Sequence, residues 1–155
     1  MKSEINISGN RLRIARDFEA PRPLVFSYWT KAEKLEKWST CKEAVKCEVV
    51  MDFRVGGSFT QKMTLAVHGE NCEYSVTGTY DEIVEPERIV YQANFGFFTS
   101  TVTVEFSEQG MGTRVVLTHD GLPDEGFGRN VSIGTDESFD KLDSMLAAQA
   151  EPARK

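Results

Sequence analysis

The sequence predicts an α+β helix-grip fold, in which a curved antiparallel sheet of about seven strands wraps around one long C-terminal helix. Three observations predict this fold. Between residues 11 and 119, most segments alternate apolar and polar residues with the period of two that is typical of strands. Two short helical patterns follow the first strand. An amphipathic pattern at residues 130–149 closes the chain and is long enough for a helix that fills the concavity of the sheet.

The first strand is expected at residues 11–18, after ten residues that carry little pattern. Its apolar face carries Leu12, Ile14, Arg16 and Phe18. Arg16 must find a carboxylate or several acceptors there, because an unpaired buried guanidinium is costly. Glu82 also falls on an apolar face. The two residues could form a buried pair, either as fold support or as part of ligand recognition.

Two short helices are expected next. The motif Ala20-Pro21-Arg22-Pro23 ends the first strand, and proline suits the first turn of a helix. Residues at helical spacing follow, namely Leu24, Val25, Tyr28 and Trp29. The second helix is expected from Lys31 to Trp38, where Leu35 and Trp38 lie three residues apart.

The next two strands are expected at residues 45–53 and 58–67, on either side of the tight reversal Arg54-Val55-Gly56-Gly57. One face of the first strand carries Val45, Cys47, Val49, Met51 and Phe53. One face of the second carries Phe59, Gln61, Met63, Leu65 and Val67. Both segments alternate cleanly, which predicts a strand in each case.

A long hairpin from Glu73 to Phe98 follows. Its two strands meet at Glu85-Pro86-Glu87-Arg88, where Pro86 suits position i+1 of a type I turn. Gly78 within the first strand indicates a bulge or a bend. The last two strands are expected at residues 101–106 and 113–119, and a loop at residues 121–128 precedes the long helix.

Length and charge limit the possible functions. A chain of 155 residues is long enough for one domain with one core, and residues 1–155 are expected to form it. The net charge of −6 and the sequence pI near 5.0 argue against a nucleic-acid partner. No apolar run reaches the length of a membrane span, and no signal-peptide segment is recognisable at the amino terminus. A cytoplasmic monomer or homodimer is therefore expected.

Signatures of catalysis and of cofactor binding were not found. The sequence contains no Gly-x-Ser-x-Gly, P-loop, dinucleotide-binding or His-Glu-x-x-His motif, and its three cysteines lack metal-site spacing. We therefore expect no cofactor and no metal. His119 shares a strand face with Val115 and Leu117, where it could be an acid, a base, a ligand-binding donor or a satisfied structural histidine.

The expected inward-facing residues either form a plain core or line a cavity for a hydrophobic ligand. From the sheet they are Tyr74, Val76, Tyr80, Tyr91, Phe95, Val104, Leu117 and His119, and from the long helix Phe139, Leu142, Met145 and Leu146. A curved sheet over a single helix leaves space unless bulky side chains fill it. The ten Phe, four Tyr and two Trp could fill it, so both alternatives stay open.

A set of motifs points to a known family. They are Ala20-Pro21-Arg22-Pro23-Leu24-Val25-Phe26, Tyr28-Trp29-Thr30, Arg54-Val55-Gly56-Gly57, the stretch from Gly78 to Arg88, Gly112-Thr113-Arg114, and Thr118-His119-Asp120-Gly121-Leu122. With them, residues 11–148 resemble the START-like superfamily, also called SRPBCC or birch-pollen-allergen-like. Within it the chain is most similar to the family named after the C-terminal domain of activators of the heat-shock-protein-90 ATPase.

The sequence departs from the family pattern at two places. A second tryptophan often follows the one at Trp38, where this chain has Ser39, and a Gly-Trp pair often opens the last helix, where it has Gly134-Thr135. Both departures would alter the volume of a cavity.

The resemblance implies a helix-grip fold with a hydrophobic cavity between the sheet and the long helix, and it implies no single reaction. Three functions stay open. The first is binding of a hydrophobic or amphipathic small molecule, such as a lipid or a polyketide. The second is a co-chaperone or stress-response role through contact with a heat-shock chaperone. The third is an enzyme of the cyclase or hydratase type that uses His119 with Arg16 or a tyrosine.

Overall fold

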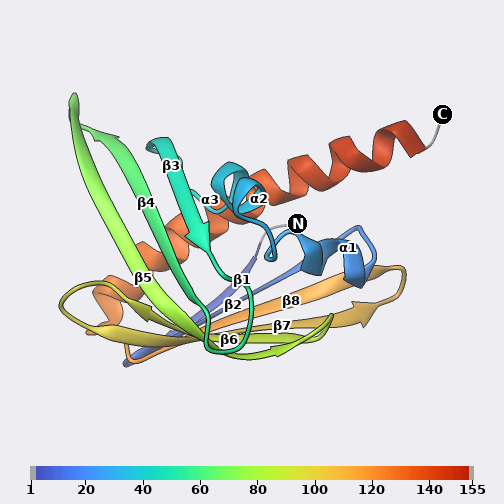
Figure 1. The fold of residues 1–155 in the computed structure, drawn as a ribbon, viewed down its shortest axis with the longest axis horizontal. Coiled ribbons are helices and arrows are strands. Elements are labelled where there is room, and N and C mark those ends of the chain that lie inside the picture. The colour runs from blue at the N-terminus through green and yellow to red at the C-terminus, as the bar shows by residue number, and fades with distance from the viewer. Residues whose placement is uncertain (1–2, 154–155) are drawn as a thin grey trace.

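The computed structural model describes residues 3–153, with side chains for residues 3–149. One eight-stranded antiparallel sheet wraps around a long C-terminal helix (Figure 1). The strands are β1 (Glu4–Ser8), β2 (Arg11–Phe18), β3 (Ala44–Met51), β4 (Ser58–Val67), β5 (Glu70–Val84), β6 (Arg88–Asn94), β7 (Thr99–Gln109) and β8 (Gly112–Asp120). The helices are α1 (Arg22–Ser27), α2 (Ala32–Trp38) and α3 (Glu125–Ala153). The predicted α+β helix-grip fold is confirmed.

The strand order across the sheet is β1-β2-β8-β7-β6-β5-β4-β3. Strands β3 to β8 form a meander, because tight turns return the chain beside the strand that it has just left. Gly56 and Gly110 supply two of these turns, with φ of 84° and 62° that suit glycine. In Figure 1, β3, β4 and the first half of β5 stand up from the other strands, so that the sheet encloses a hollow that α3 crosses.

Helix α3 packs into this hollow with one apolar stripe. Phe139, Leu142 and Leu146 are all buried, and the ring of Phe139 meets the edge of Phe18 with centroids 5.4 Å apart. Because residues three and four apart share one helix face, the stripe follows directly from their spacing. The long helix therefore covers the concave face, as the sequence predicts.

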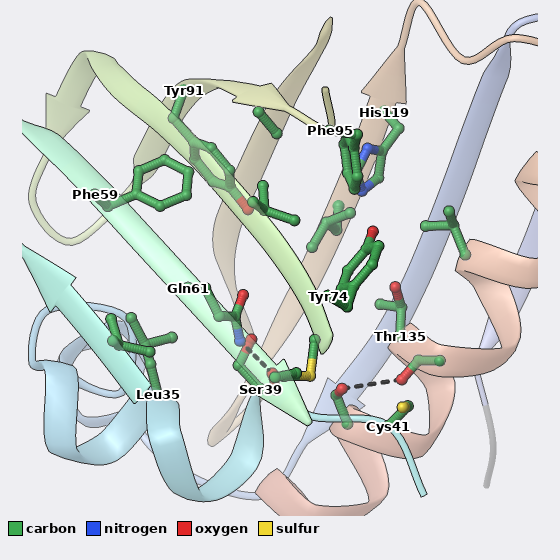
Figure 2. A pocket seen from close by; sticks show the side chains of 18 of the residues that line it. Leu35, Ser39, Cys41, Phe59, Gln61, Tyr74, Tyr91, Phe95, His119 and Thr135 are labelled. Atoms are coloured by element: carbon green, nitrogen blue, oxygen red, sulfur yellow. Dashed lines mark hydrogen bonds between the residues drawn. The ribbon is translucent and has the colours of Figure 1, made fainter. Parts of the chain in front are cut away.

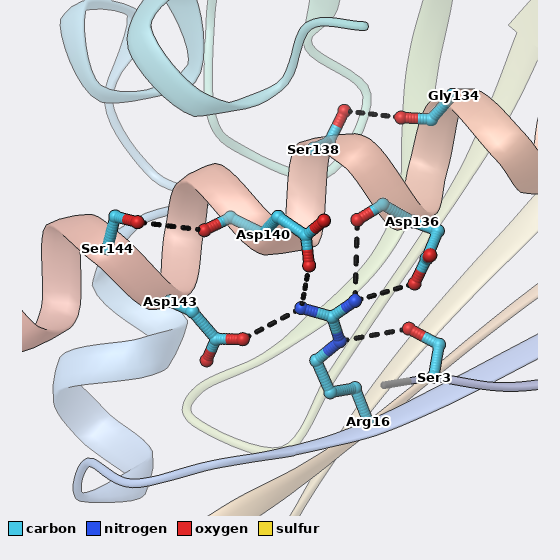
Figure 3. A network of polar contacts seen from close by, with 8 residues as sticks. All are labelled: Ser3, Arg16, Gly134, Asp136, Ser138, Asp140, Asp143 and Ser144. Carbon is cyan, nitrogen blue, oxygen red and sulfur yellow. Dashed lines mark hydrogen bonds and ion pairs between the residues drawn. The ribbon is translucent and has the colours of Figure 1, made fainter. Parts of the chain in front are cut away.

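Arg16 on β2 fastens α3 to the sheet (Figure 3). Its Nη2 lies 2.5 Å from Asp136 Oδ1, and its Nη1 lies 2.9 Å from Asp140 Oδ1 and 2.7 Å from Asp143 Oδ2. Nε donates to Ser3 Oγ at 2.9 Å. Burial opposes the charged form of this side chain, but the hydrogen bonds to the three aspartates outweigh burial and raise the pKa of Arg16. The predicted need for carboxylate partners is confirmed.

The predicted partner of Arg16 is wrong. Glu82 is exposed and forms an ion pair with Arg88, whose Nε lies 2.8 Å from Glu82 Oε1. The β5–β6 register shifts between Tyr80 and Glu82. Such an irregularity breaks the two-residue alternation, so Tyr80 is buried while Glu82 faces solvent.

Two short helices link β2 to β3. Pro21 immediately precedes α1 in an extended conformation, which is the arrangement that ends the strand and begins the helix. Trp38 at the end of α2 donates its indole N–H to the Tyr28 carbonyl at 2.9 Å, and its ring lies 4.6 Å from that of Trp29. Both tryptophans therefore join the core from this side.

Several predicted boundaries are wrong. The first ten residues include strand β1, so the sheet has eight strands and not seven. Strand β6 ends at Asn94 instead of continuing to Phe98, because a reversal begins there in which the Phe95 N–H donates to the Phe98 carbonyl. Helix α3 begins at Glu125, within the predicted loop, where Asp124 Oδ1 accepts the Phe127 N–H at 2.8 Å as a cap.

Three local predictions also need correction. The Glu85–Pro86 peptide is cis and Val84 accepts the Glu87 N–H, so Pro86 is the third residue of the turn and not the second residue of a type I turn. Gly78 pairs in register with Ala93, which excludes the bulge and leaves the bend as the remaining one of the two predicted alternatives. Val45 is 62% exposed, because the register between β3 and β4 shifts next to it.

Candidate functional site

A cavity of about 470 Å³ lies between α3 and the concave face of the sheet (Figure 2). Strands β3, β4, β5, β6 and β8, the α1–α2 region and the first half of α3 all contribute to its wall. The lining residues are Trp29, Leu35, Trp38, Ser39, Cys41, Val49, Phe59, Gln61, Met63, Leu65, Tyr74, Val76, Tyr80, Ile89, Tyr91, Ala93, Phe95, Leu117, His119, Phe127, Asn130, Val131, Gly134, Thr135, Ser138 and Phe139. The hollow is therefore not filled by α3.

Small side chains explain why space remains beneath the helix. Three of the α3 residues that line the cavity are small, namely Gly134, Thr135 and Ser138, and Ser39 lines it from the segment after α2. Ser39 and Thr135 are the two positions at which resembling sequences often carry tryptophan. Two indole rings are thus absent from the wall of this cavity, which leaves room for another molecule.

Polar contacts hold the wall opposite α3 in place. Ser138 Oγ donates to the Thr40 carbonyl at 2.9 Å, and the Lys141 ammonium donates to Thr40 Oγ1 and to the Cys41 carbonyl. Gln61 Nε2 donates to the Ser39 carbonyl at 2.6 Å (Figure 2). These bonds hold the segment after α2 against α3 and β4. The backbone on this side of the cavity is therefore held in place, which maintains the width of the cavity.

One end of the cavity is built from aromatic rings of adjacent strands. Tyr80 and Tyr91 are directly opposite each other on β5 and β6, with ring centroids 6.1 Å apart. Phe59 on β4 meets Tyr91 edge-on at 5.2 Å. Strand pairing alone brings these three residues together, because their side chains point to the same face of neighbouring strands.

The other end contains His119. Its Nδ1 lies 3.0 Å from the buried Ser100 Oγ, and Ser100 is the only hydrogen-bond partner of the ring among residues 3–149. The Phe95 ring lies near both His119 and Tyr74, with centroid distances of 6.4 Å and 6.2 Å. Burial lowers the pKa of His119 to about 4, so the imidazole is neutral at physiological pH.

Three tyrosine hydroxyls face the cavity without a protein partner. Within the part of the chain whose side chains are described, Tyr74, Tyr80 and Tyr91 form no hydrogen bond through their hydroxyl groups. Burial raises the pKa of Tyr74 and of Tyr91 to about 12, and it raises that of Tyr80 further. The phenols therefore remain protonated and can donate to a bound molecule.

The structure separates the predicted site residues into two groups. Eight line the cavity: Tyr74, Val76, Tyr80, Tyr91, Phe95, Leu117, His119 and Phe139. Val104, Leu142, Met145 and Leu146 do not, and instead pack in the core between α3 and the sheet. Arg16 is also outside the lining and is not brought to His119. His119 and Arg16 therefore do not share a site, which excludes the predicted enzyme that uses these two residues together.

Other lining residues were not predicted as part of a site. The alternation over residues 58–67 placed Phe59, Gln61, Met63 and Leu65 on one face, and that face does line the cavity. The alternation on β4 therefore contains the information needed to find these four lining residues. Phe127 could not be found in this way, because it falls in the predicted loop, where the helix begins earlier than its apolar pattern indicates. Asn130 is a polar residue at the first position of the predicted helix, so no apolar pattern marked it.

A curved sheet covered by one long helix over a largely apolar cavity defines a START-like protein of the helix-grip class. The sequence model of the family described as activator of Hsp90 ATPase homolog 1-like protein matches residues 19–147. The chain belongs to this family. No curated protein matches the sequence.

Solved structures of similar proteins support the same fold. Protein CV1439 from Chromobacterium violaceum is 25% identical with a TM-score of 0.80, over 88% of this chain and 96% of that chain. A putative uncharacterized protein from Rhizobium leguminosarum is 26% identical with a TM-score of 0.69, over 94% and 99%. The AHSA1 protein SPO3351 from Silicibacter pomeroyi is 22% identical with a TM-score of 0.75, over 90% and 99%.

Two further kinds of site were considered. Among the described residues, no group of three or more His, Cys, Asp or Glu side chains is placed to hold a metal ion. None of the described helices combines the length and the apolar character that a membrane crossing requires.

Proposed function

We propose that this protein binds a small hydrophobic or amphipathic molecule in the cavity between α3 and the sheet. The observation that carries the proposal is the space of about 470 Å³ that remains although both tryptophans and three of the four tyrosines surround it. This volume falls within the range of roughly 300–1,000 Å³ that is usual for small-molecule sites.

The energetics of packing favour an occupant. Side chains that face an empty space lose dispersion contacts, and large cavities lower stability. A molecule that fits would restore those contacts and remove its own apolar surface from water. The walls are supported by the Ser138, Lys141 and Gln61 hydrogen bonds, so binding would require little rearrangement of the backbone.

A fluorescence titration with the uncharged probe N-phenylnaphthylamine tests the proposal. We expect saturable binding of one probe per chain. Thr135→Trp should weaken binding at least about 10-fold, because an indole would occupy the space that the probe needs. The matched control is Ile133→Trp, which adds the same side chain to the same helix at an exposed position.

The outcomes separate cavity binding from adsorption on the surface. Equal affinities for the Ile133→Trp variant and the unmodified protein are expected. The proposal fails if the probe shows no saturable binding, or if Thr135→Trp binds it as tightly as Ile133→Trp does. Circular dichroism of both variants verifies that each retains the fold.

A second candidate is contact with a heat-shock chaperone, which the description of the matching family favours. It predicts that the purified protein accelerates the ATPase activity of Hsp90. An ATPase rate that is unchanged at saturating concentrations of this protein would remove the candidate. The Thr135→Trp variant should act like the unmodified protein in that assay if the contact uses the outer surface.

A further inference from the structure

We propose that the cavity selects an uncharged ligand with a flat ring system and hydrogen-bonding oxygen atoms at both ends, and that it rejects carboxylates. The inference rests on the proposed function and narrows the class of ligand. Three features of the wall carry it: the lack of charged groups, the position of the tyrosine and histidine side chains, and the number of aromatic rings.

The wall carries no formal charge. Over residues 3–149, no Asp, Glu, Lys or Arg side chain lines the cavity. Two cations that lie against the middle of α3 are already engaged, because Arg16 is held by three aspartates and the Lys141 ammonium donates to Thr40 and Cys41. A bound carboxylate would lose its hydration without gaining a cation, which strongly disfavours it.

The tyrosine and histidine side chains of the wall form two separate sets. Further polar side chains also line the cavity, namely Ser39, Gln61, Asn130, Thr135 and Ser138. Tyr80 and Tyr91 are neighbours on β5 and β6 at one end, and Tyr74 and His119 both lie near Phe95 at the other. In Figure 2, Tyr91 and His119 are well separated and approach the space from different strands. Neutral phenol and imidazole groups donate to, or accept from, hydroxyl and carbonyl oxygens. A ligand with one oxygen at each end would satisfy both sets.

Flat aromatic rings make up much of the wall. Trp38 and Phe139 lie 6.3 Å apart with an angle of 32° between their planes, and both line the cavity. Phe59 and Tyr91 add an edge-to-face pair. Flat walls of this kind make extensive contacts with a planar molecule, and aromatic pairs are stabilised in offset and edge-to-face geometries. We therefore favour fused or linked rings over a flexible acyl chain.

Displacement of N-phenylnaphthylamine by a matched series tests the inference at neutral pH. The series is naphthalene, naphthol, dihydroxynaphthalene with hydroxyls at opposite ends, and naphthoate. Naphthol should bind about 10-fold more tightly than naphthalene, and dihydroxynaphthalene more tightly again. Naphthoate should bind at least about 100-fold more weakly than naphthol.

Tyrosine variants identify the hydroxyl groups that cause the tighter binding of the hydroxylated naphthalenes. Tyr80→Phe combined with Tyr91→Phe should reduce the advantage of dihydroxynaphthalene over naphthol without weakening the binding of naphthalene. Tyr28→Phe is the matched control, because the Tyr28 hydroxyl bonds to Gln149 and lies outside the cavity. Naphthoate that binds as tightly as naphthol overturns the inference alone. Absence of any probe binding removes the proposed function and the inference with it.

Discussion

Replacing Arg16 by methionine should loosen α3 from the sheet. Methionine keeps an apolar stem of similar length, but it removes the guanidinium that holds Asp136, Asp140 and Asp143. Removing one partner of a buried ion pair costs about 3–5 kcal/mol. The three carboxylates are 29%, 43% and 44% exposed and can regain water, so we expect the lower end, about 3 kcal/mol.

Urea denaturation followed by circular dichroism measures this loss. Arg114→Met is the matched control, because Arg114 also pairs with two carboxylates, Asp17 and Glu4, but both of these are more than half exposed. Its loss should be at most about 1 kcal/mol. In a thermal scan, Arg16→Met should lower Tm by about 6–12 °C for a chain of this size.

One result would refute the reasoning. If Arg16→Met costs no more stability than Arg114→Met, Arg16 is not the principal link between α3 and β2. Converting Asp136, Asp140 and Asp143 to asparagine in the Arg16→Met background should recover part of the loss, because it removes mutual repulsion along one helix face.

Two further predictions, each with a control substitution, concern His119 and the packing around Gly78. Between pH 6.5 and about 4 the unfolded chain protonates His119 while the folded chain does not, so stability rises with pH across this window and falls on acidification, by up to about 3 kcal/mol. In urea titrations, His119→Gln should lose the fall in stability between pH 6.5 and about 4, and substitution of the exposed His68 should keep it. Parallel profiles of stability against pH for His119→Gln and the unmodified protein would contradict the assignment to His119. Gly78→Ala should cost about 1–3 kcal/mol in the same assay, since the new Cβ would lie 1.9 Å from the Gln92 carbonyl oxygen and 2.7 Å from the Phe59 ring. Gly134→Ala meets only Cys41 Cβ at 3.7 Å and should stabilise α3 by about 0.5–1 kcal/mol, so equal effects of the two glycine substitutions would be incompatible with the packing around Gly78.

Much of the fold follows from alternation in the sequence. Strand β4 has the predicted bounds, Ser58–Val67, because every second residue faces the hollow. Strand β1 was missed because it is a five-residue edge strand on which only Ile7 is even half-buried. Without a buried face, a strand leaves little periodic signal.

The site was harder to predict because it depends on volumes and on partners from distant segments. The requirement of Arg16 for carboxylates was clear, but the acidic face of α3 reads as solvated surface until the helix is placed against β2. Whether aromatic residues fill a hollow or surround it depends on how closely α3 approaches β4 and β5. Alternation along a strand carries no information on that distance.

A crystal structure of the complex with N-phenylnaphthylamine tests the central claim most directly. We expect electron density for the probe beneath α3, in contact with Thr135 and Phe139 on one side and with Val76 and Tyr91 on the other. A structure in which side chains fill that space, or in which the probe lies on the outer face of the sheet, would contradict it.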